Sequence, residues 1–103
     1  VTELTIYSWF ATYDQAGEHE LNFVYDTAAQ RVVTIDFFAN PITAGTYTLG
    51  DNLSKTYCKY QGNTLSECVV EVTENADGTL TFDANFVVNY ARYHFNYTAK
   101  IYE

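Results

Sequence analysis

Positive charge is scarce in this sequence. Its 103 residues include 5 Lys and Arg against 13 Asp and Glu, so the formal net charge is −8. A surface of this sign repels phosphate backbones and anionic lipid headgroups. The chain also lacks any stretch of about 18 or more apolar residues, which is the length that a membrane helix needs. These absences exclude a membrane-spanning helix and a nucleic-acid partner.

Residues that interrupt strands or form cross-links are also few, with 1 Pro, 5 Gly and 2 Cys. By contrast, the chain has 10 Tyr and 7 Phe, and 48% of its residues are hydrophobic. Aromatic side chains fit the pleated surface of a sheet, and a chain of this length can bury a core without a cofactor. The composition predicts a single all-β domain over residues 1–103 with no cofactor. Because the first residue is Val1 and not Met, we expect a processed product or a piece of a longer chain.

Apolar residues recur at every second position, which is the period of a half-buried strand. The clearest stripes are Leu80 to Val88 and Tyr93 to Ile101. Opposite residues of an antiparallel pair share a face, so inward Phe82 and Phe86 should lie opposite other inward residues. The pattern predicts an antiparallel meander of about eight strands that closes into a small up-and-down, lipocalin-like barrel, and the alternative is a two-sheet β-sandwich. The other expected strands cover residues 3–13, 20–25, 32–39, 46–49, 55–60 and 65–73.

The first expected strand carries apolar side chains on both faces. Leu4, Ile6 and Phe10 share one face, and Tyr7, Trp9, Ala11 and Tyr13 share the other. An exposed aromatic row is a hypothetical binding surface, because flat rings stack on ligands at a low entropic cost. The alternative is that both faces are buried. The hypothetical ligand-binding residues are Tyr7, Trp9, Tyr13, Phe38 and Tyr57.

The two cysteines, Cys58 and Cys68, are candidates for a disulfide. Both are expected to point inward, and a hairpin loop centred on Asn63 would place them opposite each other. Opposed residues of an antiparallel pair lie about 4.5 to 5.5 Å apart at Cα, which a disulfide accepts. The alternative is two buried thiols that pack as small apolar side chains. No metal site is expected, because no His or further pair of Cys lies at ligand spacing.

Other polar residues suggest little chemistry. Glu18, His19 and Glu20 follow a turn, but strand neighbours point to opposite faces, so at most two of them can converge on a cation. His94 has Asp83 as an expected cross-strand neighbour, yet no Ser or Cys joins them as a nucleophile. Outward carboxylates at Asp36, Glu71 and Asp83 are expected to keep the surface soluble. The sequence therefore predicts a protein that is not an enzyme.

Two stretches carry a family resemblance: "VVTIDFFANPITAGTYTLGD" at 32–51 and "VVEVTENADGTLTFDANFVV" at 69–88. With the Tyr-rich last strand, they resemble a β-domain that recurs in predicted lipoproteins of gut Bacteroidetes, whose members have no settled biochemical role. The resemblance begins near Leu21, and "GTYTLG" after a proline is its most distinctive part. It implies a lipocalin-like or sandwich-like fold, export to the periplasm or cell surface, and a lipid anchor outside this segment. The chain departs from the family at "YDQAGEHE", at "YTAKIY" and in its cysteines, so the resemblance implies no loop-borne function.

Together these observations predict a non-catalytic structural or interaction module of an exported bacterial protein, with an unknown protein or glycan partner. The alternative is a β-barrel that binds a glycan fragment or a small apolar ligand through Tyr, Trp and Phe side chains. Large inward side chains such as Phe23, Phe82 and Phe95 are enough to fill a small barrel. We therefore expect a packed interior without a sizeable ligand cavity.

Overall fold

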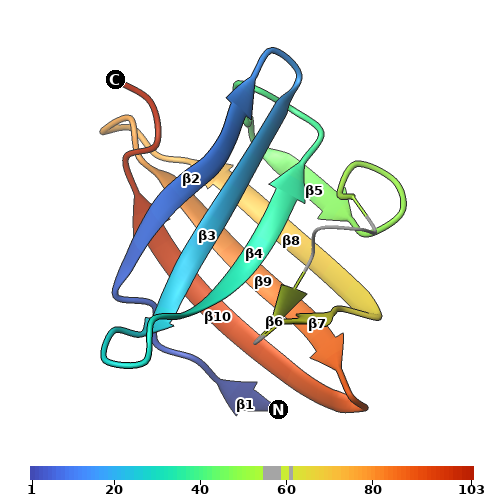
Figure 1. Ribbon diagram of the computed structural model, residues 1–103. Coiled ribbons are helices and arrows are strands. Elements are labelled where there is room, and N and C mark those ends of the chain that lie inside the picture. Colours follow the sequence, from blue (N-terminus) through green and yellow to red (C-terminus); the bar gives the residue numbers. More distant parts are fainter. Residues whose placement is uncertain (55–58, 61) are drawn as a thin grey trace.

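The computed structural model describes residues 1–54, 59–60 and 62–103, whose strands form two β-sheets (Figure 1). The front sheet has the strand order β2-β3-β4-β6-β7, and the back sheet has the order β1-β10-β9-β8-β5. Strands of the front sheet run across those of the back sheet in Figure 1. No helix in these residues is long and apolar enough to cross a bilayer. The strands are β1 (Thr2–Glu3), β2 (Ser8–Gln15), β3 (Glu18–Asp26), β4 (Arg31–Phe37), β5 (Gly45–Thr48), β6 (Lys59–Tyr60), β7 (Asn63–Thr64), β8 (Glu67–Glu74), β9 (Leu80–Val88) and β10 (Ala91–Ala99).

The prediction of a closed up-and-down barrel is wrong. The described strands form two separate sheets and resemble a sandwich more than a barrel, so the alternative describes the fold better. Consecutive strands pair only within each sheet, as β2-β3-β4 in front and β8-β9-β10 behind. The chain leaves the front sheet after β4, and β5 pairs with β8 instead. Pro41 lies in this connection, where its missing N–H cannot extend the hydrogen-bond ladder of β4.

The core lies between the sheets and is rich in phenylalanine. Phe23 and Phe37 of the front sheet and Phe82, Phe86 and Phe95 of the back sheet are each 0% exposed. The ring centroid of Phe23 lies 5.3 Å from that of Phe82 and 5.0 Å from that of Phe95. Rings at this spacing attract each other, and burying one such side chain stabilises the fold by about 1.5–3 kcal/mol. The large inward residues therefore meet across two sheets, and not around a barrel axis.

The hairpin of β9 and β10 confirms the predicted register. Phe82 lies opposite Tyr97, and Phe86 lies opposite Tyr93. Burial alternates along β9, as the apolar stripe of the sequence indicates. The adjacent turn between β8 and β9 contains Gly78, whose φ of 86° is in the left-handed region that favours glycine. Local patterns therefore specify both the faces and the pairing of this part of the back sheet.

The segment around the cysteines differs from the prediction. Tyr60 lies opposite Asn63, so the hairpin of β6 and β7 is not centred on Asn63. Beyond this tight turn the chain enters the back sheet, where Cys68 of β8 is buried opposite Phe86. Cys58 lies outside the described residues. The disulfide between Cys58 and Cys68 therefore stays a prediction.

The first predicted strand is divided between the two sheets. β1 runs parallel to β10, with Glu3 opposite His94. The Leu4 N–H donates to the His94 carbonyl over 2.8 Å in the back sheet, whereas the Tyr7 N–H donates to the Val24 carbonyl over 2.9 Å in the front sheet. The chain therefore crosses from one sheet to the other between Leu4 and Tyr7. The parallel pairing of β1 with β10 makes the back sheet mixed and not purely antiparallel.

Candidate functional site

A tight turn determines which side chains of β3 reach the outer face of the front sheet. Only Ala16 and Gly17 connect β2 with β3. Gly17 has a φ of 83°, which residues with a side chain adopt only at an energetic cost. Glu18 and Glu20 share the outer face of β3, while His19 between them points inward and is 2% exposed. Glu18 and Glu20, but not His19, can therefore contact the same ligand on the outer face.

A β-bulge in β2 turns Tyr13 outward. The pairing of β2 with β3 shifts its register between Ala11 and Tyr13. An extra residue in one strand reverses the alternation of its side chains. Trp9, before the bulge, is partly buried against the core, whereas Tyr13, after it, is 39% exposed. The structure therefore divides the expected row of Tyr7, Trp9 and Tyr13.

Tyr13 and Phe38 line one pocket on the outer face, which we call the acidic–aromatic pocket. It has a volume of about 380 Å³, and Thr12, Glu18 and Glu20 complete its lining. Phe38 follows β4 and is 50% exposed. The pocket therefore combines exposed aromatic rings with carboxylates from the neighbouring strand.

Asp36 of β4 lies beside this pocket, directly opposite Glu20 of β3. It was expected to be a solvated surface acid, but it is 0% exposed, and apart from a proton shared with Glu18 no donor group of the described residues reaches its side-chain oxygens. Burial, a hydrogen bond with Glu18 and repulsion by Glu18 and Glu20 raise the pKa of Asp36 to about 8. Asp36 therefore holds a proton at neutral pH.

A second pocket, which we call the apolar pocket, lies on the same sheet face. It has a volume of about 400 Å³ and is lined by Phe10, Val24, Thr27, Gln30 and Val32. Phe10 is 47% exposed. Phe10 was not among the predicted binding residues, although it follows Trp9 in the strand and alternation places it on the other face.

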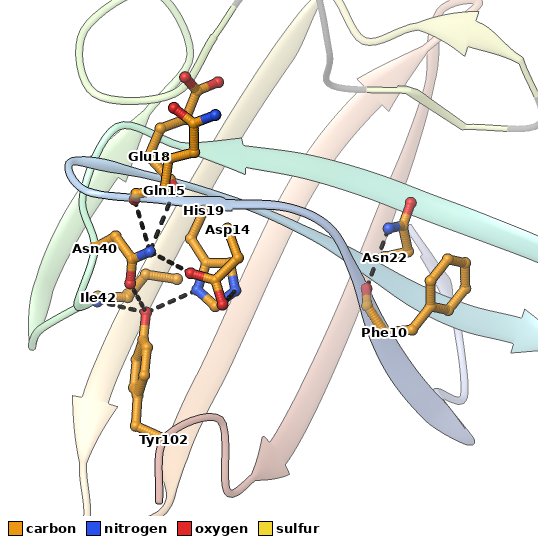
Figure 2. Close-up of polar contacts among 9 residues, drawn as sticks. All are labelled: Phe10, Asp14, Gln15, Glu18, His19, Asn22, Asn40, Ile42 and Tyr102. Carbon is orange, nitrogen blue, oxygen red and sulfur yellow. Dashed lines mark hydrogen bonds and ion pairs between the residues drawn. The ribbon is translucent and has the colours of Figure 1, made fainter.

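A row of polar residues, Thr12, Asn22 and Thr34, separates the two pockets. The Asn22 amide nitrogen donates to the Phe10 carbonyl over 3.1 Å and to Thr12 Oγ1 over 3.0 Å; Figure 2 shows the first of these contacts. Thr34 Oγ1 donates to Asn22 Oδ1 over 2.6 Å. Asn22 is only 3% exposed, so its bonds to both neighbouring strands hold the centre of the face in one geometry.

A hydrogen-bond network on the inner side of the β2–β3 hairpin contains His19 (Figure 2). The Tyr102 hydroxyl donates to Asn40 Oδ1 over 2.9 Å and accepts the Ile42 N–H over 2.9 Å. It also lies 2.8 Å from His19 Nδ1, which is then the donor. His19 Nε2 lies 3.7 Å from the Asp14 carboxylate, and burial lowers the pKa of His19 although Asp14 acts in the opposite direction.

The same network ties three segments of the chain together. Asn40, from the connection after β4, donates to Asp14 Oδ1 over 2.7 Å and to the Gln15 carbonyl over 2.8 Å at the end of β2. Tyr102 brings the segment after β10 to the same place. The network therefore fixes the hairpin that carries Glu18 and Glu20, and its histidine serves a structural role.

His94 forms a separate cluster on the back sheet. Its Nδ1 lies 2.7 Å from the Glu3 carboxylate, and its Nε2 contacts Asp83. Hydrogen bonding to Glu3, followed by that to Asp83, raises the pKa of His94 although partial burial opposes the shift. The expected approach of His94 to Asp83 is confirmed, but both ring nitrogens are engaged by carboxylates. This cluster holds β1 against β10 and offers no free base.

A stack of aromatic rings lies inside the sandwich, near the ends of β3 and β6. The rings of Tyr25 and Tyr60 are 5.0 Å apart, those of Tyr60 and Tyr93 are 4.6 Å apart, and those of Tyr93 and Phe86 are 5.4 Å apart. Desolvation raises the pKa of Tyr60 and that of Tyr93. These rings cover one another, so the stack packs the fold and presents no open platform.

The expected aromatic residues are thus distributed over several environments. Tyr7 is 61% exposed beside β2, Trp9 packs inward, and Tyr13 and Phe38 share the acidic–aromatic pocket. Tyr57 lies outside the described residues. Within the part of the chain that the structure describes, no His, Cys, Asp and Glu side chains converge as a metal site.

Comparisons with protein-family models, with curated proteins and with solved structures found no match to this chain. The proposed function therefore rests on the geometry of the outer face, and the resemblance to Bacteroidetes lipoprotein domains stays a prediction.

Proposed function

We propose that this chain is a non-catalytic interaction module of an exported bacterial protein, and that it binds a partner protein through the outer face of its front sheet. The supporting observation is a group of exposed aromatic side chains on that face, where Phe10 is 47%, Tyr13 39% and Phe38 50% exposed. Such side chains around pockets are typical of binding surfaces, because covering them removes large apolar areas from water at a low entropic cost.

The chemistry of the face favours a partner with basic and aliphatic side chains. Glu18 and Glu20 line the acidic–aromatic pocket, and the whole chain has a net charge of −8. Opposite charges steer association and select the partner. Phe10, Val24 and Val32 line the apolar pocket, which suits an aliphatic side chain. A protein segment that carries both kinds of residue would complement the two pockets together.

The positions of the two histidines support a non-catalytic role. His19 is 2% exposed and bonds to Tyr102, while both nitrogens of His94 are engaged by carboxylates. A general base needs a free lone pair within reach of a substrate. Neither histidine meets this requirement, which favours binding over catalysis.

The proposal of export rests on the resemblance of residues 32–51 and 69–88 to β-domains of Bacteroidetes lipoproteins. The first of these stretches supplies Asp36 and Phe38, so the resemblance includes part of the proposed face. Fractionation of source cells tests the location. The protein that contains this chain should appear in the periplasmic or membrane fraction, and recovery from the cytosol alone would contradict export.

A second function, the binding of a glycan fragment or a small apolar ligand, is favoured by the apolar pocket of about 400 Å³. Its aromatic side chain, Phe10, could stack on a sugar ring. Phe23 and Phe82 fill the space between the sheets, so such a ligand would bind on the outer face. This differs from the interior barrel site that the sequence suggested.

Selection from a random peptide library, followed by binding measurements, tests the proposed function. Peptides selected on the wild-type protein should lose about tenfold or more in affinity for Phe38→Ser, because a buried aromatic contact is removed. Tyr90→Ser is the matched control, since Tyr90 is 104% exposed in the turn after β9. Equal binding to Phe38→Ser and wild type would contradict the proposal. A glycan array that yields Phe38-dependent ligands while the peptide selection yields none would replace it with the second function.

A further inference from the structure

The acidic–aromatic pocket has negative groups that no basic side chain balances. Glu18 and Glu20 line it, and Asp36 lies opposite Glu20. The ion pairs that join described residues involve none of these three acids. The pocket therefore presents the carboxyl groups of Glu18 and Glu20 without a counter-charge, and Asp36 lies buried beside them.

Among these acids, Asp36 lacks hydrogen-bond donors from the rest of the described chain. It is fully buried, and apart from the proton that it shares with Glu18 no donor group of the described residues reaches its side-chain oxygens. Its neighbour Glu18 accepts the hydrogen bond of the Asp36 proton, so neither acid brings a cationic partner to the pocket. A cation beside Glu18 and Glu20 would supply a positive charge that the ion pairs among the described residues do not give these two acids.

We infer that the acidic–aromatic pocket binds the guanidinium group of an arginine side chain of the partner. This inference rests on the proposed function, because the partner protein supplies the arginine. A guanidinium presents a fork of N–H donors that pairs with a carboxylate such as Glu18 or Glu20. Its flat faces stack on aromatic rings, and Tyr13 and Phe38 offer such rings at the same pocket.

The geometry favours a guanidinium over other cations. Among the described residues, no acids converge closely enough to form a metal site. A cation that spreads its charge over a planar group can contact carboxylates that stand further apart. A lysine ammonium is a compact charge without a flat face, so it would use the carboxylates but not the rings. The pocket volume of about 380 Å³ accommodates the larger group.

Titration of the isotope-labelled protein with N-acetyl-arginine amide, followed by NMR, tests the inference. The amide signals of Tyr13, Glu20 and Phe38 should shift in a saturable way. N-acetyl-citrulline amide has nearly the same shape without the charge and should cause no saturable shift. Glu20→Gln should weaken the binding of the arginine compound by about tenfold, because it removes a charge-assisted hydrogen bond.

Glu71→Gln is the matched control, because Glu71 is exposed on the back sheet and its substitution changes the net charge equally. This variant should bind the arginine compound as the wild type does. Equal binding of the citrulline compound or of N-acetyl-lysine amide would overturn the guanidinium assignment. So would an equal loss of affinity in Glu20→Gln and Glu71→Gln.

The arginine site and the wider interaction face can be refuted separately. Library peptides that need Phe38 but bind Glu20→Gln as tightly as wild type would refute the arginine site and leave the interaction face intact. Saturable binding of the arginine compound in the pocket, without any Phe38-dependent peptide, would support the site and contradict the wider face.

Discussion

Replacing Asp36 by Asn should make the protein more stable at neutral pH, although most substitutions at buried positions destabilise a protein. Burial and the neighbouring acids raise the pKa of Asp36 from 3.8 to about 8. Asp36 must therefore take up a proton when the chain folds at pH 7. Asn has nearly the same shape and an N–H donor for Glu18, and it needs no proton.

The magnitude follows from the link between proton binding and folding. Between the unfolded and the folded pKa only the folded state holds the extra proton, so stability falls as pH rises. Each pH unit in this window lowers the free energy of unfolding by about 1.4 kcal/mol. At pH 7, Asp36→Asn should therefore be more stable than the wild type by up to about 4 kcal/mol. Near pH 4 the free energies of unfolding should agree within about 1 kcal/mol.

Urea unfolding at pH values from about 4 to about 8 measures this difference, with the fluorescence of Trp9 as the signal. Asp51→Asn is the control, because Asp51 is exposed in a turn and its substitution removes the same charge. The stability difference between Asp51→Asn and wild type should not grow with pH in this window. A constant difference between Asp36→Asn and wild type would show that folding does not change the protonation of Asp36, and the raised pKa would then be wrong.

Other perturbations test the supporting contacts. Glu3→Gln should lower the pKa of His94 in an NMR titration. The stability that the Glu3–His94 pair contributes should be present below about pH 6.5 and lost as pH rises through the pKa of His94 in the folded protein. An unchanged pKa of His94 would contradict the ion pair. Tyr102→Phe should lower the free energy of unfolding in urea by about 1–3 kcal/mol, because the partners of its hydroxyl are left buried without a hydrogen bond. An unchanged free energy of unfolding would show that the network contributes nothing. Gly17→Ala should cost about 1–2 kcal/mol in the same assay, because φ at this position is 83°; an unchanged midpoint would mean that the turn adopts another conformation.

Alternation along the chain was enough to predict which side chains face the core. Phe82, Phe86 and Phe95 are fully buried, and the β9–β10 register agrees with the sequence pattern. This part of the fold is predictable because a strand places alternate residues on opposite faces, whatever lies beside it. The same rule places Val24 and Val32 on the outer face of the front sheet.

Alternation does not specify which strands become neighbours. The pairing of β5 with β8 and the parallel pairing of β1 with β10 join segments far apart in the sequence, and no local pattern indicates either of them. The closed barrel was predicted because every strand was assumed to pair with the next one. For the same reason, the contact of Glu3 with His94 was missed.

The candidate site depends on two features that the sequence hides. One extra residue between Ala11 and Tyr13 forms the bulge that turns Tyr13 outward, and nothing in the residue types marks its place. Asp36 does lie on the outward face that alternation predicts, yet it is completely covered. Its burial arises from tertiary contacts, so an outward position was wrongly taken to mean a solvated one.

Hydroxyl-radical footprinting tests directly whether the outer face of the front sheet is the binding surface. In the free protein, exposed Phe10, Tyr13 and Phe38 should be oxidised, while buried Phe23 should not. A peptide selected for binding should protect the three exposed rings and leave Tyr90 as reactive as before. Protection of Tyr90 with unchanged oxidation of Phe10, Tyr13 and Phe38 would contradict the account.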